Sequence, residues 1–92
     1  MIVRISGEAQ YELPENDAER LNELDNQAAE AAQAGDEASF HRHFNAMLDL
    51  IARDGTELGE DELVESDVIL PPRDISFEEA KGEFTGEGLI PD

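Results

Sequence analysis

The fold is decided by residues 36–55, which read DEASFHRHFNAMLDLIARDG. Asp36 is a typical N-cap residue, because its carboxylate can accept a hydrogen bond from a free N–H group of the first helical turn. Arg53 lies in the last turn, where a cation is favourable, and Gly55 fits the position just after a helix end. Between these limits large apolar residues recur every three or four positions, which predicts an amphipathic helix. These residues are Phe40, Phe44, Met47, Leu48 and Ile51.

A second helix is predicted just before this one, over residues 15–34. One apolar stripe runs along it with members three or four positions apart: Leu21, Leu24, Ala28 and Ala31. Gly35 is expected to end this helix, and Asp36 begins the next one. Because so short a connection leaves no room for another arrangement, the two helices should be antiparallel neighbours with their stripes in contact.

Two short strands are predicted at the N-terminus. Residues 2–6 are rich in β-branched side chains, and residues 9–13 alternate between apolar and polar side chains. Gly7-Glu8 is a turn candidate between them, so the two strands should pair as a hairpin. Pro14 ends the second strand and is well placed at the start of the helix that follows.

The C-terminal third is less regular. Residues 56–62 are polar and acidic and indicate a loop, whereas residues 63–64 and 68–70 are short apolar segments that favour extended backbone. A capping box that begins at Ser76 predicts a short helix over residues 76–84. Its inner face should carry Phe77, Ala80 and Phe84.

Together these elements predict a single α+β domain over residues 1–92. We expect a small antiparallel sheet packed against an antiparallel helical hairpin, plus a short C-terminal helix. The sequence contains no internal repeat, linker or low-complexity tract that would divide it.

The charge balance is strongly acidic. Asp and Glu total 24 against 6 Lys and Arg, which gives a formal net charge of −18, and Lys81 is the single lysine. Such a chain is either partly disordered or adapted to high salt, where a Debye length of about 3 Å at 1 M screens the repulsion. The clear periodicity of the aliphatic residues favours a salt-adapted globular protein.

The same charge limits the partners and the location. Phosphate backbones and anionic lipid head groups repel an acidic surface, so we expect no nucleic-acid binding and no direct membrane insertion. The apolar runs are also too short for a membrane span or a secretory signal, which favours a cytoplasmic protein.

The sequence carries no pattern typical of catalysis. It has no cysteine, no glycine-rich phosphate loop and no nucleophile elbow. His41 and His43 form a His-x-His pair, but on a helix this offset points the two rings about 200° apart, which opposes a shared metal. We therefore expect no enzyme activity and no cofactor.

An alternative is a small-molecule- or metal-binding α+β domain that uses the acidic segment 57–67. Its carboxylates would be Asp61, Glu62, Glu65 and Asp67. The segment lacks the register of a calcium loop, in which oxygen ligands alternate around a sharp-turn glycine. A mimic of nucleic-acid phosphates is a weaker option, because the acidic residues show no regular spacing.

The remaining candidate is a surface for another protein. Two apolar, proline-punctuated stretches flanked by acidic residues should lie at a sheet edge or cover the core, since proline cannot donate to a strand ladder. The candidate partner-binding residues are Ser66, Asp67, Val68, Leu70, Pro71, Pro72, Leu89, Ile90 and Pro91. A sheet edge formed by residues 2–6 or 68–70 could also pair with a second copy to give a homodimer.

Several stretches of the chain resemble the PspAA family, small proteins associated with the phage-shock protein PspA. They are MIVRI (1–5) with QYELP (10–14), LNELD (21–25) with AGDE (34–37), and DELV (61–64) with SDVILPP (66–72) and EGLIP (87–91). The likeness covers essentially the whole chain. Its main departure is the acid load and the scarcity of lysine, which fits a haloarchaeal-like acidic version.

The resemblance implies an accessory or adaptor role beside PspA, a coiled-coil membrane-remodelling protein related to the eukaryotic ESCRT-III machinery whose system responds to envelope stress. It would place the protein at the membrane only through PspA. It supplies no catalytic residues.

Overall fold

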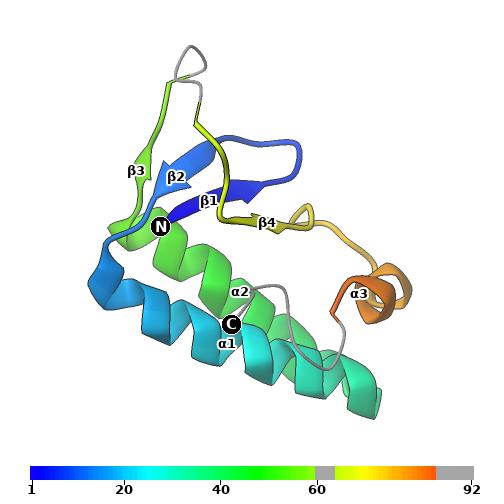
Figure 1. Ribbon diagram of the computed structural model, residues 1–92. Coiled ribbons are helices and arrows are strands. Elements are labelled where there is room, and N and C mark those ends of the chain that lie inside the picture. The colour runs from blue at the N-terminus through cyan, green and yellow to red at the C-terminus, as the bar shows by residue number, and fades with distance from the viewer. Residues whose placement is uncertain (60–63, 85–92) are drawn as a thin grey trace.

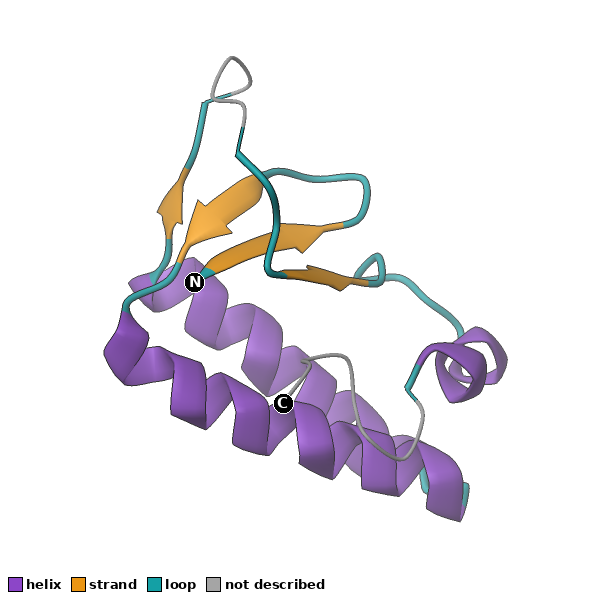
Figure 2. Cartoon of the chain, viewed as in Figure 1, coloured by secondary structure: helices purple, strands orange, loops and turns teal. Residues whose placement is uncertain are grey.

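The computed structural model describes residues 1–59 and 64–84. A four-stranded sheet lies on one side of two long, antiparallel helices, and a third, short helix stands beside them (Figures 1 and 2). The predicted α+β class and the helical hairpin are therefore confirmed.

The two long helices have the predicted bounds. Helix α1 spans Glu15–Ala34 and helix α2 spans Glu37–Asp54. Gly35 ends α1 in the left-handed conformation (φ 75°, ψ 20°), which glycine adopts at little cost. The Asp36 carboxylate then accepts a hydrogen bond from the Ser39 backbone N–H at 3.1 Å, as expected of an N-cap.

Gly55 follows α2 as predicted, but glycine is required at this position for a different reason from the one at Gly35. Its backbone is extended (φ −81°, ψ 153°), so it is not a left-handed cap. A Cβ atom at this position would lie only 2.5 Å from the Ile51 carbonyl oxygen. The chain needs glycine here because a larger residue would not fit against the last helical turn.

The sheet is mixed rather than wholly antiparallel. Its order is β3-β2-β1-β4, with bounds Thr56–Glu57 (β3), Gln10–Glu12 (β2), Ile2–Ile5 (β1) and Val68–Leu70 (β4). The predicted β1–β2 hairpin is antiparallel, and so is β2–β3, but β4 pairs with β1 in parallel. The antiparallel prediction fails for β4 because the connection from β3 crosses from one edge of the sheet to the other. A tight hairpin turn cannot do this.

Two further details differ from the sequence prediction. Thr56 and Glu57 form β3, although residues 56–62 indicated only a loop. Two exposed polar residues carry no periodic signal, so this strand exists through its pairing with Tyr11 and Glu12. Of the predicted extended segment 63–64, Leu63 lies outside the described residues and Val64 is exposed and not in a strand.

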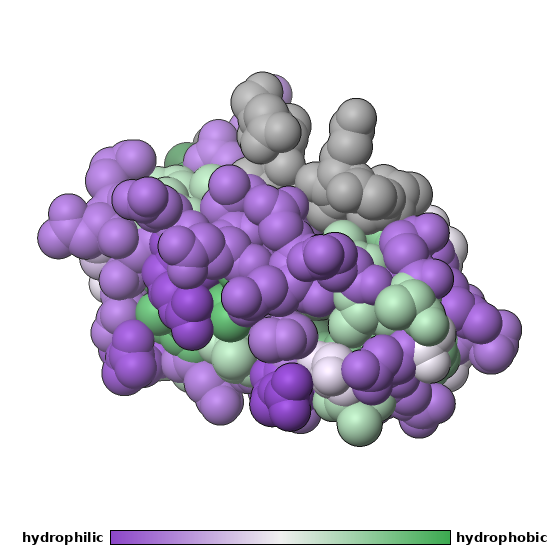
Figure 3. Space-filling model, turned by 90° about the horizontal axis from the view of Figure 1, so that it is seen from below, coloured by the Kyte–Doolittle hydropathy of each residue, from purple (hydrophilic) through white to green (hydrophobic). Residues whose placement is uncertain are grey.

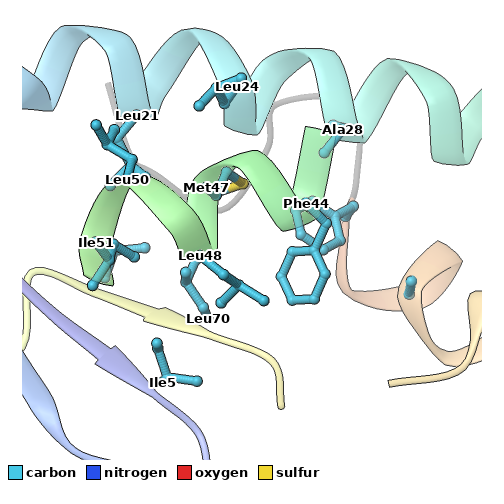
Figure 4. Close-up of a cluster of buried hydrophobic side chains, with 14 of the residues drawn as sticks. Ile5, Leu21, Leu24, Ala28, Phe44, Met47, Leu48, Leu50, Ile51 and Leu70 are labelled. Carbon is cyan, nitrogen blue, oxygen red and sulfur yellow. The ribbon is translucent and has the colours of Figure 1, made fainter. Parts of the chain in front are cut away.

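The core lies between the sheet and the helices. Figure 4 shows Leu21, Leu24 and Ala28 of α1 facing the α2 side chains, with Ile5 of β1 and Leu70 of β4 on the sheet side. The α2 residues in this layer are all buried: Phe40, Phe44, Met47, Leu48, Leu50 and Ile51. The two predicted apolar stripes therefore form one continuous core.

Helix α3 spans Phe77–Glu83 and is held by aromatic packing. Ser76 caps it by accepting a hydrogen bond from the Glu79 N–H at 3.2 Å, which confirms the predicted start. The Phe84 ring lies 5.1 Å from Phe40 and 5.8 Å from Phe44, centroid to centroid. Gln33 of α1 also donates a hydrogen bond to the Phe84 carbonyl at 2.8 Å.

Candidate interaction surface

Part of the predicted partner-binding set lies in the interior of the domain. Val68, Leu70 and Pro71 are buried, the first two in the hydrophobic core, whereas Pro72 is exposed. Leu89, Ile90 and Pro91 lie outside the described residues. Within the described part of this set, the side chains that another protein could reach are therefore polar residues and one proline.

Ser66 and Asp67 make hydrogen bonds inside the domain. The buried Gln10 amide donates to the Ser66 hydroxyl at 2.7 Å and to the Val64 carbonyl at 3.1 Å. The Asp67 carboxylate accepts a hydrogen bond from the Ile2 N–H at 2.7 Å. These contacts hold the segment before β4 against the first two strands, a structural role that their sequence positions did not reveal.

The more exposed apolar residues lie close by. Among the described residues, the exposed large hydrophobic side chains are Ile69 at 56% and Val64 at 43%. Ile69 lies inside the predicted proline-punctuated stretch 68–72 but was not among the individual residues named for it, and Val64 was in neither. The exposure of Ile69 could have been predicted from the sequence. Side chains alternate along a strand, so in Val68-Ile69-Leu70 the middle side chain points away from its two buried neighbours.

Arg4 lies beside Ile69 and was also missed. It is exposed between the buried Val3 and Ile5, so it points to the face of the sheet that the helices do not cover. Four of the other basic residues make ion pairs with carboxylates: Arg20 with Glu23, Arg53 with Asp54, Arg73 with Glu8, and Lys81 with Glu78. Within residues 1–59 and 64–84, Arg4 has no such partner within 4.0 Å.

The shortest of these ion pairs joins the β1–β2 turn to the segment after β4. The Arg73 guanidinium donates two hydrogen bonds to the Glu8 carboxylate, at 2.7 Å from Nε and 2.9 Å from Nη2. These hydrogen bonds lower the pKa of Glu8 below its ordinary 4.5 and raise the pKa of Arg73. Both side chains are at the surface, so the pair is worth at most about 1 kcal/mol.

We expect the coupling free energy between Glu8 and Arg73 to depend on pH. Because the folded state lowers the pKa of Glu8, the stabilisation is complete above the unfolded pKa and is lost as the pH falls through the folded pKa, below 4.5. A double-mutant cycle with Glu8→Gln and Arg73→Gln should give a coupling free energy of about 0.2–1 kcal/mol at pH 7. Urea denaturation at several pH values measures it, and a coupling that does not decline in acid would contradict the assignment.

The acidic segment 57–67 is only partly described by the structure. Asp61 and Glu62 lie outside the described residues, and Glu65 and Asp67 are exposed. Within residues 1–59 and 64–84, no group of three or more His, Asp or Glu side chains is placed to hold a metal ion. His41 and His43 lie on α2, and His41 instead faces Glu37 at 3.7 Å.

Two shallow cavities lie elsewhere on the molecule. One of about 260 Å³ lies at the N-terminus, between Met1, Leu13 and Thr56. The other, of about 220 Å³, lies between α1 and α2 over Leu24, Ala46 and Leu50. Neither of these two cavities is lined by a carboxylate of segment 57–67.

The helical side of the molecule is mainly hydrophilic, with small apolar patches (Figure 3). No helix among the described residues has the length and hydropathy needed to cross a membrane.

Comparison with known protein families gives a match that spans the whole chain. The family model of PspAA, described as PspA-Associated protein, matches residues 1–92. No curated protein and no solved structure matches the chain. The chain therefore belongs to the PspAA family of PspA-associated proteins.

Proposed function

We propose that this protein is a non-enzymatic accessory of PspA that acts by direct protein–protein contact in the response to membrane stress. The observation that carries the proposal is the family match over residues 1–92, since the family is named for its association with PspA. The domain supplies a rigid scaffold for such contact, because its two helical stripes and its sheet share one core.

The net charge supports an indirect route to the membrane. A surface with a net charge of −18 is repelled by anionic lipid head groups, so the protein would reach the bilayer by binding PspA rather than lipid. In this proposal the protein is cytoplasmic and becomes peripheral to the membrane when PspA is there.

Affinity capture tests the proposal. Tagged protein, at a salt concentration where circular dichroism shows it folded, should enrich PspA from an extract of its own cells. The control bait is an unrelated folded protein of similar size and net charge, which removes non-specific capture by acidic surfaces. Recovery of PspA at the level of this control would count against the proposed function.

A further inference from the structure

Helix α3, seven residues long, stands beside the end of the helical hairpin at which α1 meets α2 (Figure 1). So short a helix is not stable by itself in water, because its few hydrogen bonds do not offset the entropy lost in forming the first turn. Its existence therefore depends on contacts with the rest of the domain. The nature of those contacts decides how readily α3 can separate from it.

Apolar side chains hold α3 in place. Ala80 and Phe84 have no exposed surface, and Phe77 is partly buried. The ring of Phe84 lies against the rings of Phe40 and Phe44 on α2. The ring of Phe77 lies 5.8 Å from that of Phe40, centroid to centroid. We call the two phenylalanines that α2 offers to these side chains, Phe40 and Phe44, the α3 docking surface.

Polar contacts add little to this attachment. Lys81 pairs with Glu78 inside the helix, and the Ser76 cap belongs to the same segment. The Gln33 amide of α1 donates one hydrogen bond to the Phe84 carbonyl. Within residues 1–59 and 64–84, no ion pair joins α3 to another element. Because α3 contains three glutamates and one lysine, the acidic domain repels it.

We expect α3 to separate before the rest of the domain unfolds. Segments held by few buried side chains open locally, at a lower free energy than the whole core. The sheet and the two long helices pack directly on one another, so most of the core remains when α3 leaves (Figure 4). Separation exposes the α3 docking surface, whose two rings are otherwise buried.

We propose that α3 is a displaceable cover, and that an amphipathic helix of PspA binds the α3 docking surface in its place; the inference rests on the proposed function. The side chains that now fill the surface identify the occupant. Phe77, Ala80 and Phe84 stand at positions i, i+3 and i+7, so the replacing helix should carry large, small and large apolar side chains at that spacing. Basic residues beside this stripe would be attracted to the acidic domain.

A second copy of the chain is a less favourable occupant. It carries an α3 of the right shape, and exchange of such an element between copies is a known route to dimers. Each copy, however, has a net charge of −18, so two copies repel each other. A partner helix with basic residues meets no such repulsion, which favours PspA.

Ser76→Ala tests the proposal without altering the α3 docking surface. Ser76 is exposed, and its hydroxyl caps α3 by accepting the hydrogen bond from the Glu79 N–H. Loss of such a cap shifts the equilibrium between closed and open α3 by a factor of about five. The control is Asp36→Ala, which removes the corresponding hydrogen bond to the Ser39 N–H from α2. It weakens a helix of the core without acting on α3.

Amide hydrogen exchange and isothermal titration calorimetry with purified PspA, at a salt concentration where the domain is folded, measure the two effects. In Ser76→Ala the α3 amides should exchange about fivefold faster than in the wild type. The affinity for PspA should rise by the same factor, because only the open form binds. Asp36→Ala should leave both quantities within about twofold. In the wild-type complex the α3 amides should exchange faster than in the free domain.

Several results would overturn the inference. If the α3 amides of the free domain exchange as slowly as the most protected amides of α2, then α3 opens only with the whole domain. If PspA binds but α3 stays equally protected in the complex, α3 is not displaced, although the proposed function stands. Dimerisation of Ser76→Ala without tighter binding of PspA would assign the surface to a second copy. If the folded wild type does not bind PspA, the proposed function itself fails, and this inference with it.

Discussion

Replacing Phe40 with alanine should destabilise the protein by about 3–5 kcal/mol, the usual cost of removing a fully buried phenylalanine. Phe40 has no exposed surface, and its ring centroid lies 5.1–5.8 Å from those of Phe44, Phe77 and Phe84. Small domains have only about 5–15 kcal/mol of stability in total. The variant should therefore be marginal or unfolded under conditions where the wild type is folded.

Urea denaturation in molar salt, followed by circular dichroism, measures this cost. Phe77→Ala is the matched control, because Phe77 is only partly buried and packs at the edge of the same aromatic cluster. It should cost clearly less than Phe40→Ala. If the two variants lose the same free energy of unfolding, then Phe40 contributes no more than Phe77 to the packing of α3 against α2, which would contradict the prediction.

The second large effect expected is a strong dependence of stability on salt. The radius of gyration is 12.6 Å, whereas the Debye length is about 30 Å at 0.01 M salt and about 3 Å at 1 M. In dilute salt all 18 net negative charges therefore repel one another, and in molar salt only adjacent charges do. The free energy of unfolding should rise steeply between these limits, and the protein should lose helical signal in dilute buffer.

A charge-reduced variant separates screening from other effects of salt. Four exposed glutamates outside the ion pairs described above can be changed to glutamine: Glu19, Glu30, Glu65 and Glu83. This variant should be more stable than the wild type in dilute salt and nearly equal to it in molar salt. If the wild type gives a coil-like spectrum even at molar salt, the prediction of a salt-adapted fold is wrong.

The helices could be predicted from the sequence because their signals are local. The bounds of α1 and α2 follow from the flanking residues Gly35, Asp36 and Gly55 together with an apolar repeat, and each of these signals lies within the helix or directly beside it. The start of α3 follows in the same way from Ser76 and Glu79. Such patterns depend on backbone geometry over a few residues, so tertiary contacts were not needed to interpret them.

The sheet topology and the exposure of side chains on the sheet could not be predicted, because they depend on contacts between residues that are far apart in the sequence. Gln10 pairs with Ser66 across 56 positions, and Arg4 lies beside Ile69 only because β4 crosses to the far edge of the sheet. Asp25 is fully buried in α1, although a local pattern gives no reason to bury a carboxylate. The predicted set around residues 66–72 was close to the candidate surface in sequence, but the strand register decides which of its side chains is exposed.

The central claim is that the folded domain binds PspA directly. Sedimentation velocity with the two purified proteins, at a salt concentration where the domain is folded, tests it without help from other cellular components. Co-sedimentation of the small domain with PspA, saturable as its concentration rises, is the predicted result. Independent sedimentation of the two proteins, with the circular dichroism of the domain unchanged, would contradict the claim.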